Sequence, residues 1–170
     1  MVIEEFGLEH PQWVAYVAHL VRVDAARWVL DDVESGEPKT GCLYLGALEG
    51  EQVIGHIALF DQPIIIPATA WSGNVATPLT GPDGVQLRET FVQSFAVDEA
   101  YREQGVGREL QLAALAMTAD LGCIQMRSWS SLDKRANFAL KLSLGFAVHP
   151  AITETASGEK VCGAYFIKTV

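Results

Sequence analysis

The chain has 170 residues, of which 49% are hydrophobic and 19% are charged, values typical of a folded globular protein. Its formal net charge of −9 lacks the basic footprint that nucleic acid demands, and its apolar runs fall short of the ~18 residues of a membrane span. These figures favour a single domain that binds neither nucleic acid nor a membrane.

The compartment and the acidic charge give two further expectations. We expect no signal peptide, because no charged segment followed by an apolar one opens the chain. Cys42, Cys123 and Cys162 form no C-x-x-C pair, which suits reduced thiols in the cytoplasm. Residues 1–60 carry three Lys or Arg against ten Asp or Glu. This acidity has two interpretations, a solvated surface or a preference for a cationic small molecule.

Residues 1–60 predict an edge strand, helices and a hairpin. Residues 1–5 suit the edge strand, and Pro11 stands at the position of a first helical residue. Apolar residues at helical spacing predict one or two helices over residues 11–34. Runs at 42–48 and 52–60 flank a Glu-Gly-Glu turn and predict the hairpin. The apolar residues at helical spacing are Val14, Val17, Val21 and Ala25, with Trp28 further on.

Residues 61–84 contain four prolines and three glycines around the apolar run Ile64–Ile66. The Gly81–Gly84 segment is a strong turn signal. We expect a long loop or flap that carries Trp71, with room for a short additional strand. Loops of this length inside a compact domain are commonly functional.

The remaining chain predicts a long strand, a glycine-rich turn and an apolar-striped helix that ends at Gly122. A strand and a helix capped by Asp133 follow, and two paired strands close the chain. The order predicts one mixed α/β domain without internal repeats. The expected ranges are 85–97, 123–129, 146–149 and 161–168 for the strands, and about 134–143 for the last helix.

The turn at 102–108 indicates an anion-binding site. Gly105 and Gly107 allow close approach of the backbone, and consecutive N–H groups meet there at a helix N-terminus. Arg102 and Arg108 bracket the turn. Their positive charges lie near the positive end of the helix dipole, and a bound anion would offset this unfavourable interaction. Neither G-x-x-x-x-G-K-[ST] nor G-x-G-x-x-G occurs, which excludes the P-loop and the Rossmann fingerprint.

Residues 97–107 (VDEAYREQGVG) and the later Leu144-Gly145-Phe146 resemble the acetyl-CoA motif and the closing GF of the GNAT (Gcn5-related N-acetyltransferase) family. The element order agrees over nearly the whole chain, and the motifs agree from about Phe91 to Phe146. The resemblance implies a mostly antiparallel central sheet of about six to seven strands, about four helices and splayed central strands. It also implies acetyl-CoA as co-substrate and no metal.

The resemblance divides the chain by role. Residues 1–60 would supply the acceptor side, 61–84 the flap, 85–146 the acetyl-CoA-binding core, and 147–170 the closing strands. Main-chain groups of the strand before the turn would pair with the pantetheine arm. Lys134 or Arg135 would reach the coenzyme phosphates. The implied coenzyme residues are Phe95, Ala96, Val97, Arg102, Glu103, Gln104, Gly105, Val106, Gly107, Arg108, Asn137 and Lys141.

The catalytic groups depart from the family pattern. Lys141 stands where many relatives have a tyrosine that protonates the departing thiolate, and a lysine with an ordinary pKa of ~10 is a poor acid near neutrality. Phe91 stands where relatives place a glutamate base, with Glu89 on the same strand face. The candidates for acid or base are therefore Glu89, Ser143 and Tyr101, or a water relay.

The implied activity is acetyl transfer to a primary amine of a small molecule by direct attack, with a main-chain N–H near Val97 stabilising the oxyanion. Trp28, Trp71 and Trp129 are expected in the acceptor wall. A non-catalytic acyl-CoA sensor and a protein N-terminal or lysine acetyltransferase remain alternatives, and a homodimer is left open.

The four histidines show no metal-like spacing and are expected to be structural or solvated; they are His10, His19, His56 and His149.

Overall fold

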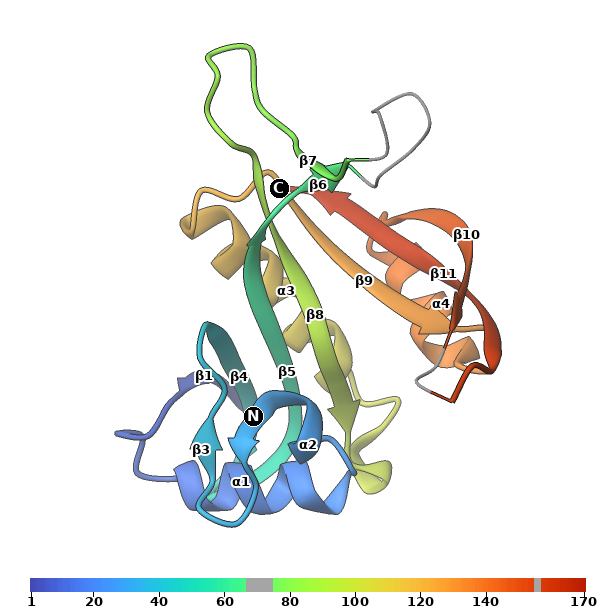
Figure 1. The fold of residues 1–170 in the computed structure, drawn as a ribbon. Helices are drawn as coiled ribbons and strands as arrows, with labels where there is room; N and C mark the ends of the chain where they lie inside the picture. The colour runs from blue at the N-terminus through green and yellow to red at the C-terminus, as the bar shows by residue number, and fades with distance from the viewer. Residues whose placement is uncertain (67–74, 155–156) are drawn as a thin grey trace.

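The computed structural model describes residues 1–66, 75–154 and 157–170. Within these ranges the chain forms a seven-stranded sheet and four α-helices (Figure 1). This architecture confirms the predicted mixed α/β fold. The sheet strands are β1 (Val2–Phe6), β4 (Cys42–Glu49), β5 (Gln52–Pro63), β8 (Arg88–Val97), β9 (Gln125–Ser131), β10 (Ala147–Glu154) and β11 (Lys160–Thr169). The helices are α1 (Trp13–Arg22), α2 (Ala26–Val29), α3 (Val106–Asp120) and α4 (Arg135–Ser143).

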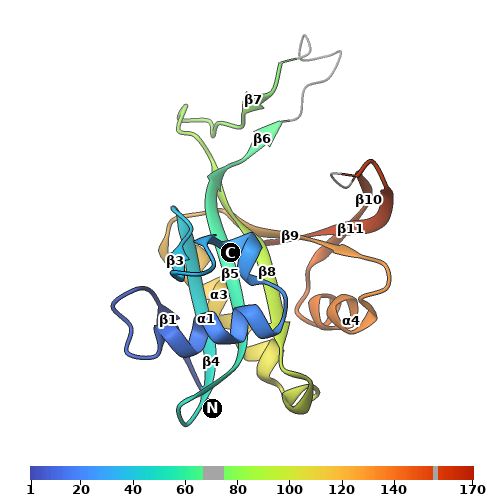
Figure 2. The ribbon, with the colours of Figure 1, turned by 60° about the horizontal axis from the view of Figure 1, so that its bottom comes forward.

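The sheet has the strand order β1-β4-β5-β8-β9-β11-β10. Its neighbouring strands are antiparallel except at the centre, where β8 and β9 run parallel. Their pairing covers only Glu89–Val92 and Gln125–Ser128. Beyond that point the two strands diverge (Figures 1 and 2). The expected splayed central strands are therefore confirmed.

A β-bulge accompanies this divergence. On β5, Ala58 pairs with Ser94 and the next residue, Leu59, pairs with Val92, so Gln93 is an additional residue on β8. A bulge bends its strand and increases the local twist. The last part of β8 consequently leaves β9, and no described strand pairs with it on that side.

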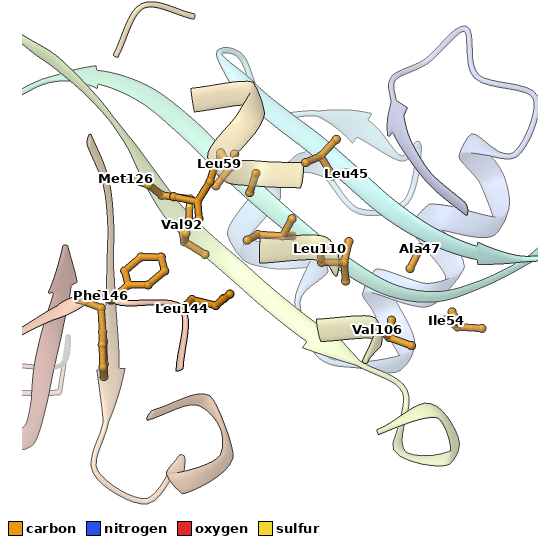
Figure 3. Close-up of a cluster of buried hydrophobic side chains, with 14 of the residues drawn as sticks. Leu45, Ala47, Ile54, Leu59, Val92, Val106, Leu110, Met126, Leu144 and Phe146 are labelled. Atoms are coloured by element: carbon orange, nitrogen blue, oxygen red, sulfur yellow. The ribbon is translucent and has the colours of Figure 1, made fainter. Parts of the chain in front are cut away.

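Helices cover both faces of the sheet. Neighbouring residues of β4 enter different buried clusters, because Leu45 packs with α3 whereas Tyr44 packs with α1 and α2. Figure 3 shows the cluster on the α3 side, which joins Leu110 to Met126 and Phe146. Helix α4 lies on this same face, and α1 crosses the opposite one (Figure 2).

The N-terminal helices differ from the prediction in phase and in extent. Val14 and Val21 are exposed, and the larger aromatic rings of α1 occupy the core instead. Helical structure ends at Val29, because the chain turns into a small hairpin of β2 (Leu30–Asp32) and β3 (Glu37–Pro38). The residues that α1 buries are Trp13, Tyr16, His19 and Leu20.

The carboxylate of Asp32 stabilises the turn between β2 and β3, where the prediction placed helix. It accepts hydrogen bonds from the backbone N–H groups of Glu34 at 2.8 Å and Ser35 at 3.4 Å. Such an Asx turn competes with helical bonding. The sequence prediction of helix up to residue 34 is therefore wrong for residues 30–34.

The flap region is partly described. Strand β5 continues to Pro63, and beyond it β6 (Ile65–Ile66) pairs with β7 (Thr77–Pro78) away from the main sheet (Figure 2). A short additional strand was anticipated in this region. Trp71, which the prediction placed in the flap, lies outside the described residues.

The predicted cap of α4 is wrong. Helix α4 begins at Arg135 with Lys134 at the N-cap position, and no side chain caps it. The Asp133 carboxylate instead accepts a hydrogen bond from the Ser131 hydroxyl and pairs with the Lys134 ammonium at 3.3 Å. The central and C-terminal hairpins, by contrast, form as predicted.

Candidate active site

The divergence of β8 from β9 opens a groove of about 880 Å³. Residues 92–97 of β8 and 128–131 of β9 form its two walls, the turn before α3 closes one end, and α4 contributes a third side. Main-chain groups of β8 that have no strand partner there can bind an extended ligand in the manner of an added strand. Within the described ranges, no cluster of three or more His, Cys, Asp or Glu side chains is arranged for a metal.

The turn at the end of the groove has the backbone of an anion site. Glu103 and Gly105 adopt positive φ angles of 62° and 88°, and alternation of this kind aims successive N–H groups into one concavity. Arg102 holds the turn against β8, because its Nε donates to the Val97 carbonyl at 3.1 Å. A Cβ at Gly105 would meet no atom within 4 Å, so this side of the turn is open to a ligand.

Gly107 lets α3 approach β8 closely. A Cβ at this position would lie 3.2 Å from Phe95 Cζ and 3.4 Å from Leu140 Cδ2, tighter than ordinary contact. Most of the implied coenzyme residues, Gly107 among them, line the groove. The side chains of Gln104 and Val106 do not line it, because Gln104 donates to the Ala100 carbonyl and Val106 is buried in the core.

Two buried polar atoms in the groove wall are without a partner. The indole N–H of Trp129 has no hydrogen-bond acceptor, and Asn137 Oδ1 has no donor, among the described residues. The Nδ2 of Asn137 donates to Ser130 Oγ at 3.1 Å, which fixes the amide. An unpaired buried donor and acceptor destabilise the free protein and favour a ligand that carries amide groups. The pantetheine arm of coenzyme A has this chemistry, so the residues present fit the coenzyme.

Lys141 lines the groove with a side chain that is only 1% exposed. Its ammonium donates to Ser128 Oγ and lies 5.4 Å from the ring centroids of both Phe146 and Phe166. Burial lowers the pKa of Lys141 to about 7. The expectation of a poor acid assumed an ordinary pKa, and the tertiary environment that changes this pKa is not visible in the sequence.

Glu89 is engaged elsewhere. Its fully buried carboxylate accepts hydrogen bonds from Arg127 Nη2 and Nε, the latter at 2.9 Å. Gln62 at 3.0 Å and Gln125 at 2.8 Å complete its surroundings. The guanidinium also lies over the Phe91 ring. Glu89 does not line the groove.

The other two acid or base candidates also lie outside the groove. The exposed Ser143 donates to the Leu140 carbonyl at 2.7 Å. Tyr101 donates weakly to Gln52 Oε1 at 3.4 Å, and burial raises the pKa of its phenol further from neutrality. The structure therefore brings together most of the implied coenzyme residues but none of Glu89, Ser143 and Tyr101.

Ser94 is one of the groove residues that the sequence did not predict. Its Oγ lies 2.8 Å from His56 Nε2, and His56 Nδ1 lies 2.9 Å from His19 Nε2. Both imidazoles are fully buried. A histidine within the apolar run VIGHIALF signals a buried polar group, but its partners lie 37 and 38 residues away along the chain.

The tryptophans divide between the groove and the surface. Trp129 lines the groove between β8 and β9, and its place in the acceptor wall stays a prediction. Trp28 does not line it; its side chain is half exposed and stacks under the Arg27 guanidinium at 4.9 Å.

Comparison with known proteins agrees with this geometry. The chain matches the Acetyltransferase (GNAT) family over residues 8–146. Arabidopsis thaliana NAA60 in complex with acetyl-CoA superposes with a TM-score of 0.69 at 10% identity, over 99% of each chain. The aminoglycoside 6'-N-acetyltransferase from Enterococcus faecium gives 0.62 at 16% identity, over 99% of this chain and 97% of that one.

The ribosomal-protein-S18-alanine N-acetyltransferase from Escherichia coli gives a TM-score of 0.60 at 16% identity, over 99% of this chain and 94% of that one. No curated protein matches the sequence. The splayed central sheet is the fold that these acetyltransferase structures share with the chain. The chain belongs to the GNAT family of acetyltransferases. No helix of the described chain has the length and apolarity to cross a membrane.

Proposed function

We propose that the protein transfers the acetyl group of acetyl-CoA to a primary amine of a small molecule. The observation that carries the proposal is the groove itself, which joins an anion-binding turn to a buried lysine with a pKa near neutrality. Strongly perturbed groups in a groove are typical of catalytic sites. A coenzyme sensor would have no use for a lysine of this kind.

The residues of the turn and of β8 hold the coenzyme. The N–H groups of residues 104–107 bind the pyrophosphate, assisted by the side chains of Arg102 and Arg108 at the rim. The unpaired edge of β8 and Asn137 bind the pantetheine arm. Acetyl-CoA supplies an activated acetyl thioester, whose sulfur leaves as a thiolate.

Lys141 supplies the proton that the leaving sulfur needs. A group with a pKa of about 7 is protonated in a substantial fraction of molecules at neutral pH and regains its proton readily. The hydrogen bond to Ser128 and the rings of Phe146 and Phe166 fix its ammonium at the inner part of the groove. Lys141 thereby takes the role that the family resemblance gives to a tyrosine.

The acceptor is a cationic small amine. Four carboxylates, all exposed, surround the β2–β3 hairpin on the face of α1 and α2. Helix α2, which leads directly into this hairpin, contacts β8, the strand that forms the groove wall. A negative surface raises the local concentration of a cationic substrate. The four carboxylates are Asp31, Asp32, Glu34 and Glu37.

The cellular setting belongs to the same proposal. All three cysteines are free thiols, and Cys123 is buried. Unpaired thiols suit the reducing cytoplasm, where acetyl-CoA and small amines meet.

The experiment is a thiol-release assay with acetyl-CoA and a panel of acceptors. The panel contains polyamines and amino sugars, short peptides with free N-termini, and peptides with an internal lysine. We expect thiol release with a small cationic amine and a smaller rate with the peptides. Faster release with a peptide would replace the small amine by a protein acceptor. Coenzyme binding without release for any acceptor would favour a sensor.

A further inference from the structure

We infer that Ser94, His56 and His19 form a proton relay that carries the proton lost by the acceptor amine from the groove to Asp98 at the surface. The inference rests on the proposed acetyl transfer and adds a route for its second proton. It assigns a role to a buried histidine pair that the coenzyme site does not use.

An unbroken chain of polar contacts connects the groove to the surface. Ser94 Oγ lies 2.8 Å from His56 Nε2, and His56 Nδ1 lies 2.9 Å from His19 Nε2. His19 Nδ1 lies 3.1 Å from Asp98 Oδ1. Ser94 lines the groove, both histidines are fully buried, and the Asp98 side chain is 13% exposed. The first two contacts are hydrogen bonds, and the third is an ion-pair contact within hydrogen-bond distance, across which a proton can pass.

The hydrogen bonds of the relay can point in either direction, toward Asp98 before the proton transfer and toward the groove after it. Before transfer, the Ser94 hydroxyl donates to His56 Nε2, His56 Nδ1–H donates to His19 Nε2, and His19 Nδ1–H donates to Asp98. Ser94 Oγ then accepts the proton of the attacking amine while each group passes its own proton onward. One N–H bond of the amine breaks and one O–H bond forms on Asp98, which becomes neutral. Ser94, His56 and His19 each lose one proton and gain another, so their charges do not change.

Arg22 stabilises the relay after transfer. Its Nη2 lies 3.0 Å from His19 Nδ1 and 2.6 Å from Asp98 Oδ2. Once His19 Nδ1 has lost its proton, it accepts from the arginine, and Asp98 releases its proton to water. His19 Nδ1 therefore has a partner in both states. Asp98 accepts from it before the transfer, and Arg22 donates to it afterwards. The Arg22 side chain is 51% exposed, so water reaches this end.

Both imidazoles are neutral over the working pH range, as a relay requires. Burial lowers the pKa of His19 to about 4 and that of His56 to about 3. The groups that face the pair are Arg22 and Asp98 beside His19, and Tyr16 beside His56, where ring centroids lie 6.3 Å apart. The Tyr16 hydroxyl donates to the Leu45 carbonyl and remains outside the chain of contacts.

The relay lies on the opposite face of the sheet from Lys141. Ser94 reaches His56 and His19 on the α1 side, whereas Lys141 packs against Phe146 and Phe166 on the α3 side. The groove connects the two faces between β8 and β9. The amine thus loses its proton on one face and the thiolate gains a proton on the other.

The test measures acetyl transfer by the wild type and by four variants. Ser94→Ala removes the hydroxyl, Ser94→Thr retains it, His56→Gln interrupts the middle of the relay, and His149→Gln replaces an exposed histidine on β10. We expect Ser94→Ala and His56→Gln to lower kcat about 100-fold, with KM for acetyl-CoA changed by less than about 2-fold. Ser94→Thr, which keeps a hydroxyl at this position, should recover most of the kcat that Ser94→Ala loses, and His149→Gln should stay close to the wild type.

Two readouts separate a relay from a structural role. In mixtures of light and heavy water, kcat of the wild type should depend non-linearly on the deuterium fraction, because several protons move together, and Ser94→Ala should lose this curvature. Nitrogen NMR of the substrate-free wild type should show His19 and His56 neutral from pH 6 to pH 8. A protonated imidazole at pH 7 would overturn the relay.

The failure of the relay differs from the failure of the proposed function. Turnover by the wild type with an unchanged kcat in Ser94→Ala would overturn the relay alone. Absence of thiol release by the wild type with every amine would overturn the proposed acetyl transfer, and the relay with it. His56→Gln changes a buried site, so circular dichroism accompanies its kinetics, while Ser94→Ala removes a single oxygen from a half-buried residue.

Discussion

The His19 and His56 side chains share a hydrogen bond of 2.9 Å although 37 residues separate them in the chain. One belongs to α1 and the other to β5, so the pair ties the helix to the sheet. Neither ring reaches solvent. Two neutral imidazoles can satisfy each other in this way, whereas two imidazolium ions would repel.

This pair makes stability depend on pH. Burial lowers the pKa of His19 to about 4 and of His56 to about 3, whereas an unfolded histidine keeps a pKa of ~6.5. The unfolded chain therefore binds more protons below pH ~6.5, and the free energy of unfolding falls as the pH falls from there toward 4. The slope should approach about 1.4 kcal/mol per pH unit for each histidine.

Urea unfolding at intervals between pH 6.5 and pH 5 measures this slope. His149→Gln, which changes an exposed histidine, should reproduce the wild-type slope, and His56→Gln should have a shallower one. Equal slopes for the wild type and His56→Gln would contradict the neutral buried pair.

Replacement of Lys141 by methionine should separate stability from activity. Methionine fills the same space without a charge to desolvate, so Lys141→Met should raise the free energy of unfolding by about 1–3 kcal/mol. The loss of the proton donor should lower kcat about 100-fold. Lys160→Met, at an exposed position of β11, is the control and should change neither quantity. Unfolding curves and thiol release are the measurements, and a destabilised or fully active Lys141→Met would oppose the assignment.

The pH dependence of kcat reports the same group. Lys141 donates a proton, so it must be protonated, and kcat at saturating substrates should fall as the pH rises through about 7. Lys141→Tyr should move this decline toward the ordinary tyrosine pKa of ~10. A profile that is the same in the wild type and in Lys141→Tyr would assign the decline to another group.

Trp129 should contribute to substrate binding through its unpaired N–H. Trp129→Phe removes this donor, and a lost hydrogen bond of about 1 kcal/mol corresponds to a rise of about 5-fold in KM for acetyl-CoA or for the amine. Trp28→Phe makes the same change at an exposed position outside the groove. Steady-state kinetics with each substrate varied in turn provide the comparison. The assignment fails if both variants keep wild-type values of both KM constants.

Local signals made the turn before α3 and the central hairpin predictable. Gly105 and Gly107 mark a strand-to-helix turn by themselves, and the central hairpin follows from alternating runs around Gly50. Features that depend on packing were not predictable. The phase of α1 is set by burial of Trp13 and Tyr16, which compete with a valine stripe of similar spacing.

The chemistry of the site needed the folded chain. The pKa of Lys141 depends on burial beside Phe166, which lies on a strand 25 positions later. Ser94 meets His56 only after β5 and β8 pair, and the sequence alone does not say which residue the buried histidine contacts. The sequence therefore predicted the glycine turn before α3, whereas the residues proposed to move protons became visible only in the structure.

Calorimetric titration with acetyl-CoA tests the central claim most directly, that the groove between β8 and β9 binds the coenzyme. We expect one molecule to bind per chain, and binding to be lost in Gly105→Glu, which directs a carboxylate into the open side of the turn. Gly50→Glu is the matched control, because Gly50 also has a positive φ, of 61°, and open space around it, but lies in the β4–β5 hairpin. It should bind as the wild type does. No binding by the wild type, or full binding by Gly105→Glu, would contradict the account.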